Sequence, residues 1–73
     1  MQTPDLRYEI ILYWSDADSA FIAEIPELPG CVSDGETYEE AVANVKDAAE
    51  AWIATAKDLG REIPTPKGRL LFA

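Results

Sequence analysis

The 73-residue sequence has no histidine and only one cysteine. Without histidine it lacks the commonest general base, the usual activating partner of a catalytic serine or cysteine, and the ligand of most zinc sites. Cys31 has no second cysteine to pair with, so an internal disulfide is excluded and a cytoplasmic location is expected. No histidine and no nearby lysine or arginine would lower the pKa of its thiol, so a reactive role is not expected and we interpret Cys31 as a small buried residue.

The sequence also lacks the segments that direct a chain to a membrane or a cofactor. No apolar run approaches the ~20 residues of a membrane span, and Met1 to Asp5 has no features of a secretion signal. There is no glycine-rich phosphate loop and no C-x-x-C pair. The carboxylates available for a metal are Glu9, Glu24, Asp34 and Glu36. Their spacing selects no site, so we expect no metal, no cofactor and no catalytic activity.

Basic residues are scarce: six stand against fourteen acidic ones, which gives a formal net charge of −8. Residues 1–56 hold two basic and twelve acidic residues, whereas residues 57–73 hold four basic and two acidic. Because phosphate backbones repel such a chain, direct binding to nucleic acid is not expected. A basic protein is the favoured partner. The alternative is that the charge only keeps a small protein soluble.

The first half of the sequence has the pattern of short strands. Alternating apolar residues predict a strand from Leu6 to Trp14, with the even-numbered side chains on one face. A polar turn over Ser15–Ser19 leads into Ala20–Ile25, which is predicted to pair with the first strand as a hairpin. Two prolines and a glycine make 26–30 a rigid bend. A short third strand is predicted over Cys31–Ser33.

A helix of about 22 residues is predicted after Thr37. Thr37 and Glu40 have the T-x-x-E spacing of a capping box, and Gly60 suits the position that ends a helix. We expect Trp52 to lie in the core, and Trp14 to lie at the core rim or on a contact surface. The predicted apolar stripe of the helix is Tyr38, Ala41, Val42, Val45, Ala49, Trp52, Ile53, Ala56 and Leu59.

The complete predicted order is β-β-β-α-β in one domain over residues 1–73. Gly68–Ala73 is predicted to form the last strand, because a free apolar tail is costly in water. Strands that precede the helix indicate an α+β fold. One helix covers only one sheet face, so the other face is expected to be exposed and to form a homo-oligomer, dimer or tetramer. The predicted oligomer interface is Ile11, Tyr13, Ile22, Leu70, Leu71 and Phe72.

Two motifs follow one another: Pro26-Glu27-Leu28-Pro29-Gly30-Cys31 and Gly35-Glu36-Thr37-Tyr38-Glu39-Glu40-Ala41. Separated by three residues and preceded by a hairpin, they resemble the HicB-like antitoxin domain, and Ile63-Pro64-Thr65-Pro66 is also similar to that family. The resemblance covers roughly residues 7–67. It implies a truncated ribonuclease H-like fold of three antiparallel strands, a helix and a further strand. Many members add a DNA-binding domain, and we expect the solitary form here.

The resemblance also implies a function. Antitoxins of this family bind and neutralise a small basic toxin of the HicA type, an mRNA-cleaving ribonuclease with a double-stranded-RNA-binding-like fold. The alternatives are a solitary, oligomeric binding or scaffold module with an unrelated partner, and a relic of a metal-dependent nuclease. An acidic helix face would cover the basic surface of such a toxin. The predicted partner-binding residues are Glu36, Glu39, Glu40, Asp47 and Glu50.

Overall fold

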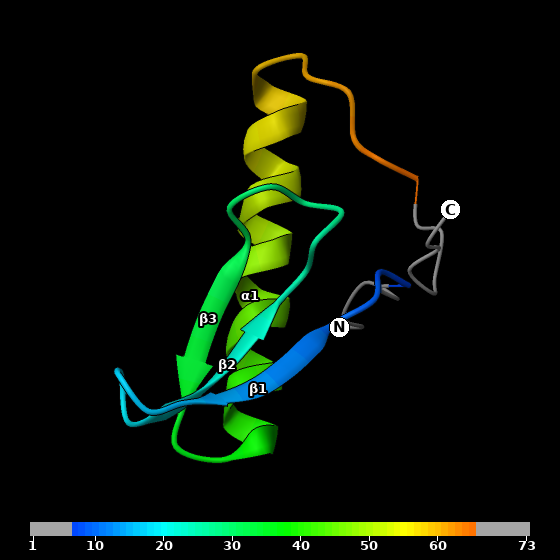
Figure 1. Cartoon of the computed structure of the whole chain (residues 1–73). Coiled ribbons are helices and arrows are strands. Elements are labelled where there is room, and N and C mark those ends of the chain that lie inside the picture. Colours follow the sequence, from blue (N-terminus) through cyan, green and yellow to red (C-terminus); the bar gives the residue numbers. More distant parts are fainter. Residues whose placement is uncertain (1–6, 66–73) are drawn as a thin grey trace, which may run out of the picture.

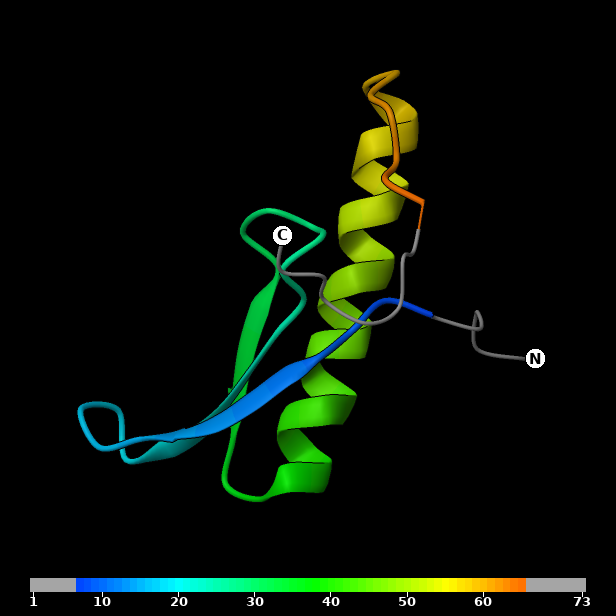
Figure 2. The ribbon, with the colours of Figure 1, turned by 45° about the vertical axis from the view of Figure 1, so that its right-hand side comes forward.

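The computed structural model describes residues 7–65 of the chain. Its strands form one antiparallel sheet in the order β1-β2-β3, and the single helix of this part lies along one face of that sheet (Figure 1 and Figure 2). The α+β class, the three-stranded sheet and the long helix are as predicted. The predicted fourth strand, Gly68–Ala73, lies outside the described residues. The elements are β1 (Ile11–Ser15), β2 (Ala20–Glu24), β3 (Val32–Gly35) and α1 (Tyr38–Asp58).

Strand β1 is shorter than predicted. It begins at Ile11 rather than near Leu6, because its partner β2 ends at Glu24, the residue opposite Ile11. Pro26 follows soon after, and a proline has no N–H with which to continue the ladder. Ile10 and Leu12 nevertheless pack against the core. The prediction that the even-numbered side chains of this segment share one face is therefore confirmed for Tyr8, Ile10 and Leu12.

Strand β3 lies one residue later at its start and two later at its end than the predicted Cys31–Ser33. It extends to Gly35 because that residue pairs with Phe21 of β2. The chain then turns into α1 so tightly that a Cβ on Gly35 would lie 2.5 Å from the backbone nitrogen of Ala41. Glycine at position 35 is therefore what lets the end of β3 approach the first turn of the helix.

Both predicted helix caps are present. The hydroxyl of Thr37, the N-cap residue, accepts a bond of 3.0 Å from the N–H of Glu40. The Glu40 carboxylate in turn accepts a bond of 2.8 Å from the N–H of Glu36, one residue before the cap. At the other end Gly60 adopts a φ of +71°, the left-handed conformation that ends many helices. Local hydrogen bonds thus fix both ends of α1.

The core lies between α1 and the sheet face that it covers. Leu28, from the middle of the proline bend, is fully buried there, which the interpretation of 26–30 as a bend did not foresee. The prediction that the apolar stripe includes Tyr38 and Leu59 is wrong, because these two side chains are 56% and 62% exposed. The last turns of α1 extend past the sheet (Figure 1). The core cluster is Tyr8, Ala23, Ile25, Leu28, Cys31, Ala41, Val45 and Ala49.

Candidate functional site

Negative charge dominates one part of the molecule. The stretch from Tyr8 to Val45 holds nine acidic residues and no lysine or arginine. It contains all three strands and the first two turns of α1. In the described part of the chain, the basic residues after this stretch are Lys46, Lys57 and Arg61. The sheet and the start of α1 are thus acidic, and positive charge increases toward the end of the helix.

The predicted partner-binding residues gather on and just before α1, and we call them the acidic face. Glu39, Glu40 and Asp47 are exposed and Glu50 is half-buried. Helical periodicity places these four on the side opposite the buried residues of α1. Glu36 precedes the helix and its backbone is held by Glu40, so one of these carboxylates also serves the helix cap. The acidic face consists of Glu36, Glu39, Glu40, Asp47 and Glu50.

The sheet face that α1 leaves uncovered carries an apolar group, which we call the sheet patch. Tyr13 and Val32 in it are 46% and 50% exposed, whereas Ile22 is only 8% exposed. Ile22 lies on the central strand between Tyr13 and Asp34, its partners on β1 and β3. The expectation that Ile22 would be exposed is therefore wrong. The sheet patch is Ile11, Tyr13, Ile22 and Val32.

The other predicted interface residues, Leu70, Leu71 and Phe72, lie outside the described residues. Their part in an oligomer stays a prediction. Val32, which sequence reasoning did not include, is exposed to a fraction similar to that of Tyr13. Its place opposite Glu24 depends on the β2–β3 register, which the sequence pattern did not fix.

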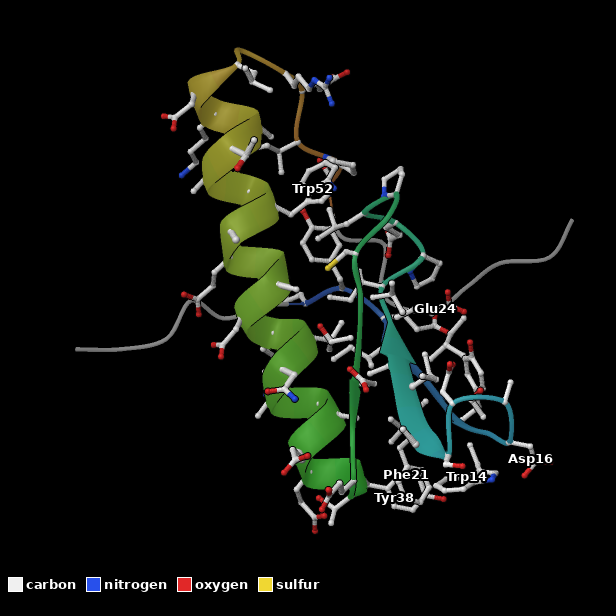
Figure 3. All side chains as sticks on the ribbon, turned by 90° about the vertical axis from the view of Figure 1, so that its left-hand side faces the viewer. Trp14, Asp16, Phe21, Glu24, Tyr38 and Trp52 are labelled. Carbon is white, nitrogen blue, oxygen red and sulfur yellow. The ribbon has the colours of Figure 1, made fainter. Side chains whose placement is uncertain are left out.

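A second group, the aromatic cluster, consists of the exposed Trp14 and Tyr38 and the half-buried Phe21. It lies where the β1–β2 hairpin meets the start of α1 (Figure 3). The ring centroids of Trp14 and Phe21 are 5.0 Å apart in an edge-to-face arrangement, and those of Phe21 and Tyr38 are 4.3 Å apart. Trp14 is 50% exposed. Sequence reasoning missed this cluster, although the pairing of Trp14 with Phe21 in the hairpin was a signal for it.

The hairpin turn places carboxylates beside the aromatic cluster. The indole N–H of Trp14 donates to Asp16 over 2.8 Å. The Ser15 hydroxyl donates to the Asp18 carboxylate over 3.1 Å, and the Asp18 N–H donates back to the Ser15 hydroxyl over 3.3 Å. The predicted polar turn is therefore confirmed, and its hydrogen bonds hold Asp16 against Trp14 and Asp18 against Ser15.

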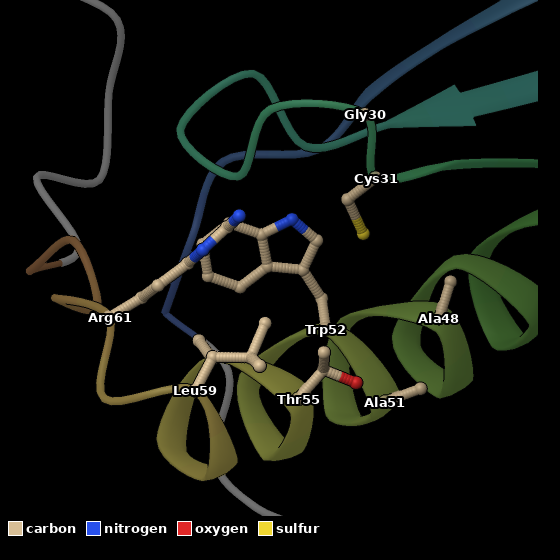
Figure 4. Close-up of a pocket in the computed structure, with 9 residues that line it drawn as sticks. Gly30, Cys31, Ala48, Ala51, Trp52, Thr55, Leu59 and Arg61 are labelled. Carbon is tan, nitrogen blue, oxygen red and sulfur yellow. The ribbon is translucent and has the colours of Figure 1, made fainter.

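The opposite end of α1 carries a groove of about 260 Å³ (Figure 4). Trp52 is half-buried rather than fully in the core, and its indole N–H donates to the Pro29 carbonyl over 2.9 Å. Cys31 lies at the groove's inner side, and burial raises the pKa of its thiol, which makes it a poor nucleophile. The groove is lined by Gly30, Cys31, Ala48, Ala51, Trp52, Thr55, Ala56, Leu59 and Arg61.

Acidic side chains are numerous in residues 7–65 but do not converge. Within this range, no three His, Cys, Asp or Glu side chains lie close enough together to hold a metal ion. The carboxylates considered for a metal in the sequence therefore do not form a cluster in this part of the chain. No helix in the same range is long and apolar enough to cross a membrane.

Comparison with known proteins agrees with the sequence motifs. Residues 8–69 match the family described as HicB_like antitoxin of bacterial toxin-antitoxin system. The UPF0150 protein Ta0767 of Thermoplasma acidophilum is 36% identical over 59 residues, which cover 81% of this chain and 84% of that protein. The UPF0150 protein ssl0259 of Synechocystis is 35% identical over 60 residues, covering 82% of this chain and 81% of the relative.

A solved structure shares the fold. The crystal structure of TTHA0281 from Thermus thermophilus superposes with a TM-score of 0.65 at 26% sequence identity. The match covers 92% of this chain and 82% of that one.

Proposed function

Because this chain belongs to the HicB-like antitoxin family, we propose that it is a regulatory protein that binds and neutralises a small basic toxin of the HicA type. An mRNA-cleaving toxin must present a positively charged surface to the phosphate backbone. A protein that covers this surface excludes the RNA by competition. Since mRNA is the target of such a toxin, we propose that the pair acts in the cytoplasm.

The observation that carries this proposal is the charge distribution. All three strands and the start of α1 lie in a stretch with nine acidic residues and no basic one. Glu39 and Asp47 of the acidic face are exposed, so the core does not require them. Complementary charge raises the rate of association with a basic partner and disfavours other partners.

The experiment that tests the proposal is isolation of the partner from the native organism. The tagged 73-residue chain is used as bait at low salt, and captured proteins are assayed for RNA cleavage with and without added bait. We expect a small basic ribonuclease whose activity falls as the bait is added. Capture of a protein that is not basic, or a ribonuclease that stays fully active, would contradict the proposal.

We also propose that this chain acts by binding and not by catalysis. RNA and DNA are expected to survive incubation with the pure protein and Mg²⁺ or Mn²⁺, because the chain offers no histidine and its carboxylates do not converge within residues 7–65. Cleavage that disappears in Glu24→Gln or Asp34→Asn would show that a carboxylate site exists.

Self-association is the second candidate, and the sheet patch favours it. An exposed apolar group on an uncovered sheet face is typical of an interface, and Tyr13 and Val32 supply it here. We expect light scattering to give at least twice the 8.0 kDa of one chain, and Tyr13→Ser with Val32→Ser to shift the protein toward the monomer. A monomer at high concentration would remove this candidate, and with it an oligomeric scaffold.

A further inference from the structure

We propose that the aromatic cluster is the anchor for arginine side chains of the basic partner. This inference rests on the proposed function, since it assumes that the partner is a basic protein. It assigns a role to Trp14, Phe21 and Tyr38, which are not part of the acidic face, although Glu39 of that face follows Tyr38 in the chain. The inference is carried by the exposure of the rings, by the Asp16 carboxylate that Trp14 contacts and by the lack of lysine and arginine from Tyr8 to Val45.

The exposed rings are not needed to complete the core. Trp14 and Tyr38 are 50% and 56% exposed, while Phe21 between them is half-buried and packs against the core. The indole N–H of Trp14 is satisfied by Asp16, two residues away. Phe21 therefore anchors the cluster, and the two outer rings are left available for contact with another molecule (Figure 3).

One carboxylate contacts this cluster directly, and two others belong to the same turns of the chain. Asp16 and Asp18 belong to the hairpin turn beside Trp14, and Glu39 follows Tyr38 in the first turn of α1. From Tyr8 to Val45 the chain offers no lysine or arginine of its own that could cover the ring faces. A cation on this surface must therefore come from elsewhere on the protein or from a partner.

The combination of ring faces and carboxylates selects arginine over lysine. A guanidinium group is planar, stacks on aromatic faces, and forms two parallel hydrogen bonds to a carboxylate. A lysine ammonium is a strongly hydrated point charge without that geometry. Tryptophan, tyrosine and arginine are also the residues most enriched at binding hot spots.

A second copy of this chain is a poorer occupant. Two such clusters facing each other would bring Asp16, Asp18 and Glu39 of one copy close to the same carboxylates of the other. Like charges placed face to face disfavour a complex. The uncovered sheet patch, in contrast, is the surface to which the proposed self-association is assigned.

The test uses three short peptides as probes: one with three arginines, one with three lysines and one with three citrullines in the same positions. Their binding is followed by NMR on the two indole N–H signals of the ¹⁵N-labelled protein. We expect the arginine peptide to shift the Trp14 signal and to leave that of Trp52 in place. It should bind about threefold more tightly than the lysine peptide, and the citrulline peptide should not bind.

Matched variants separate this site from general attraction between opposite charges. Tyr38→Ser removes a ring from the aromatic cluster, and Tyr13→Ser removes a similarly exposed ring from the sheet patch. An unchanged Trp52 signal reports that each variant is folded. Loss of the arginine preference in Tyr38→Ser alone supports the proposal. Equal binding of arginine and lysine peptides to the parent protein, or equal losses in both variants, overturns it.

The same variants distinguish this inference from the proposed function. If Tyr38→Ser and Tyr13→Ser bind the isolated toxin equally well, the aromatic cluster is not the anchor, although the antitoxin role stands. If no basic partner is captured, the antitoxin role fails. The peptide titration then still decides whether the aromatic cluster prefers arginine.

Discussion

The two tryptophans lie near opposite ends of α1, Trp14 on β1 beside the start of the helix and Trp52 in its second half, and they differ in their hydrogen-bond partners. Trp52 is half-buried and donates its indole N–H to Pro29, 23 residues away in sequence, so it ties the helix to the proline bend. Trp14 is half-exposed and donates to Asp16, only two residues away in its own hairpin. We call the region where the last turns of α1 meet the proline bend the bend end. The region where the β1–β2 hairpin meets the first turn of α1 is the hairpin end.

The two tryptophans therefore differ in whether their hydrogen bond joins distant parts of the chain. A long-range hydrogen bond from a half-buried ring fixes two elements relative to each other. A local hydrogen bond from an exposed ring orients the ring without joining distant parts of the chain. The bend end is therefore expected to determine stability, and the hairpin end, with its carboxylates, is expected to determine binding.

The largest expected effect contrasts the two tryptophans directly. Trp52→Ala should lower the free energy of unfolding by about 3 kcal/mol, because it removes packing against the core and leaves the Pro29 carbonyl without its donor. Trp14→Ala should cost about 1 kcal/mol or less, since half of that side chain is in water. Chemical denaturation followed by circular dichroism measures both. Equal losses would mean that the two ends do not differ in this way.

A second prediction concerns Gly35 at the hairpin end. Loss of the Trp14 side chain is expected to cost little stability there, but a side chain added at Gly35 is expected to cost more. Gly35→Ala should destabilise by about 2 kcal/mol, because the new Cβ would collide with the backbone of Ala41. The control is Gly60→Ala, where a Cβ meets nothing within 4 Å and only the left-handed backbone costs about 1 kcal/mol. A Gly35→Ala protein as stable as its parent would contradict the close approach of β3 and α1.

Much of this architecture follows from local sequence rules. The hairpin, the bend, both helix caps and the shared face of the even-numbered residues in the first strand were predicted because each depends on residues close together in the chain. Thr37 and Glu40 form hydrogen bonds within one turn, and Gly60 needs only its own backbone conformation. Such features are accessible before any tertiary contact is known.

Other features depend on distant partners and were missed. The start of β1 depends on where β2 ends, and the burial of Ile22 depends on neighbours in two other strands. Leu28 is buried because the bend folds over the core, which its prolines alone do not indicate. The aromatic cluster forms only when the hairpin brings Trp14 and Phe21 against Tyr38. Helical periodicity alone predicts Tyr38 in the core stripe.

The helix cap at the hairpin end gives a smaller effect. Thr37→Ala should lower the free energy of unfolding by about 1 kcal/mol, because the N–H of Glu40 loses its acceptor. Thr37→Ser keeps a hydroxyl and should retain most of that stability. Thermal unfolding of the two variants beside the parent measures the difference, and an Ala variant as stable as the Ser variant would show that the cap contributes nothing.

The bend end should also be sensitive to alkaline pH. Burial raises the pKa of the Cys31 thiol in the folded protein, so the unfolded chain loses that proton at a lower pH than the folded one. The stability from this group is fully present below the unfolded pKa and is lost as pH rises through the folded value. We expect unfolding free energy to fall as the pH rises above about 9.

The control for this pH dependence is Cys31→Ala, which removes the thiol. Its loss of stability with rising pH should be shallower than that of the parent. Tyr8 contributes in the same direction near pH 10, because burial first and then the Glu27 carboxylate raise the pKa of its phenol. A parent and a Cys31→Ala variant with the same slope would show that the thiol is not protected in the folded state.

Charge reversal on the acidic face should have the smallest effect on stability. Glu39→Lys with Asp47→Lys changes two exposed side chains, and such surface substitutions usually alter the free energy of unfolding by no more than about 0.5 kcal/mol. Asp58→Lys with Glu62→Lys makes the same change in net charge at the bend end, where both side chains are also exposed. Comparison of the two variants therefore separates the effect of where the charge is changed from the effect of the change in net charge.

The most direct test of the account is the association rate of these two variants with the captured toxin, measured by surface plasmon resonance at low and high salt. We predict that Glu39→Lys with Asp47→Lys slows association about tenfold at low salt, that the bend-end variant slows it much less, and that salt reduces the difference. Equal rates for both variants, or a parental rate for Glu39→Lys with Asp47→Lys, would contradict the claim that this chain recognises a basic partner through its acidic face.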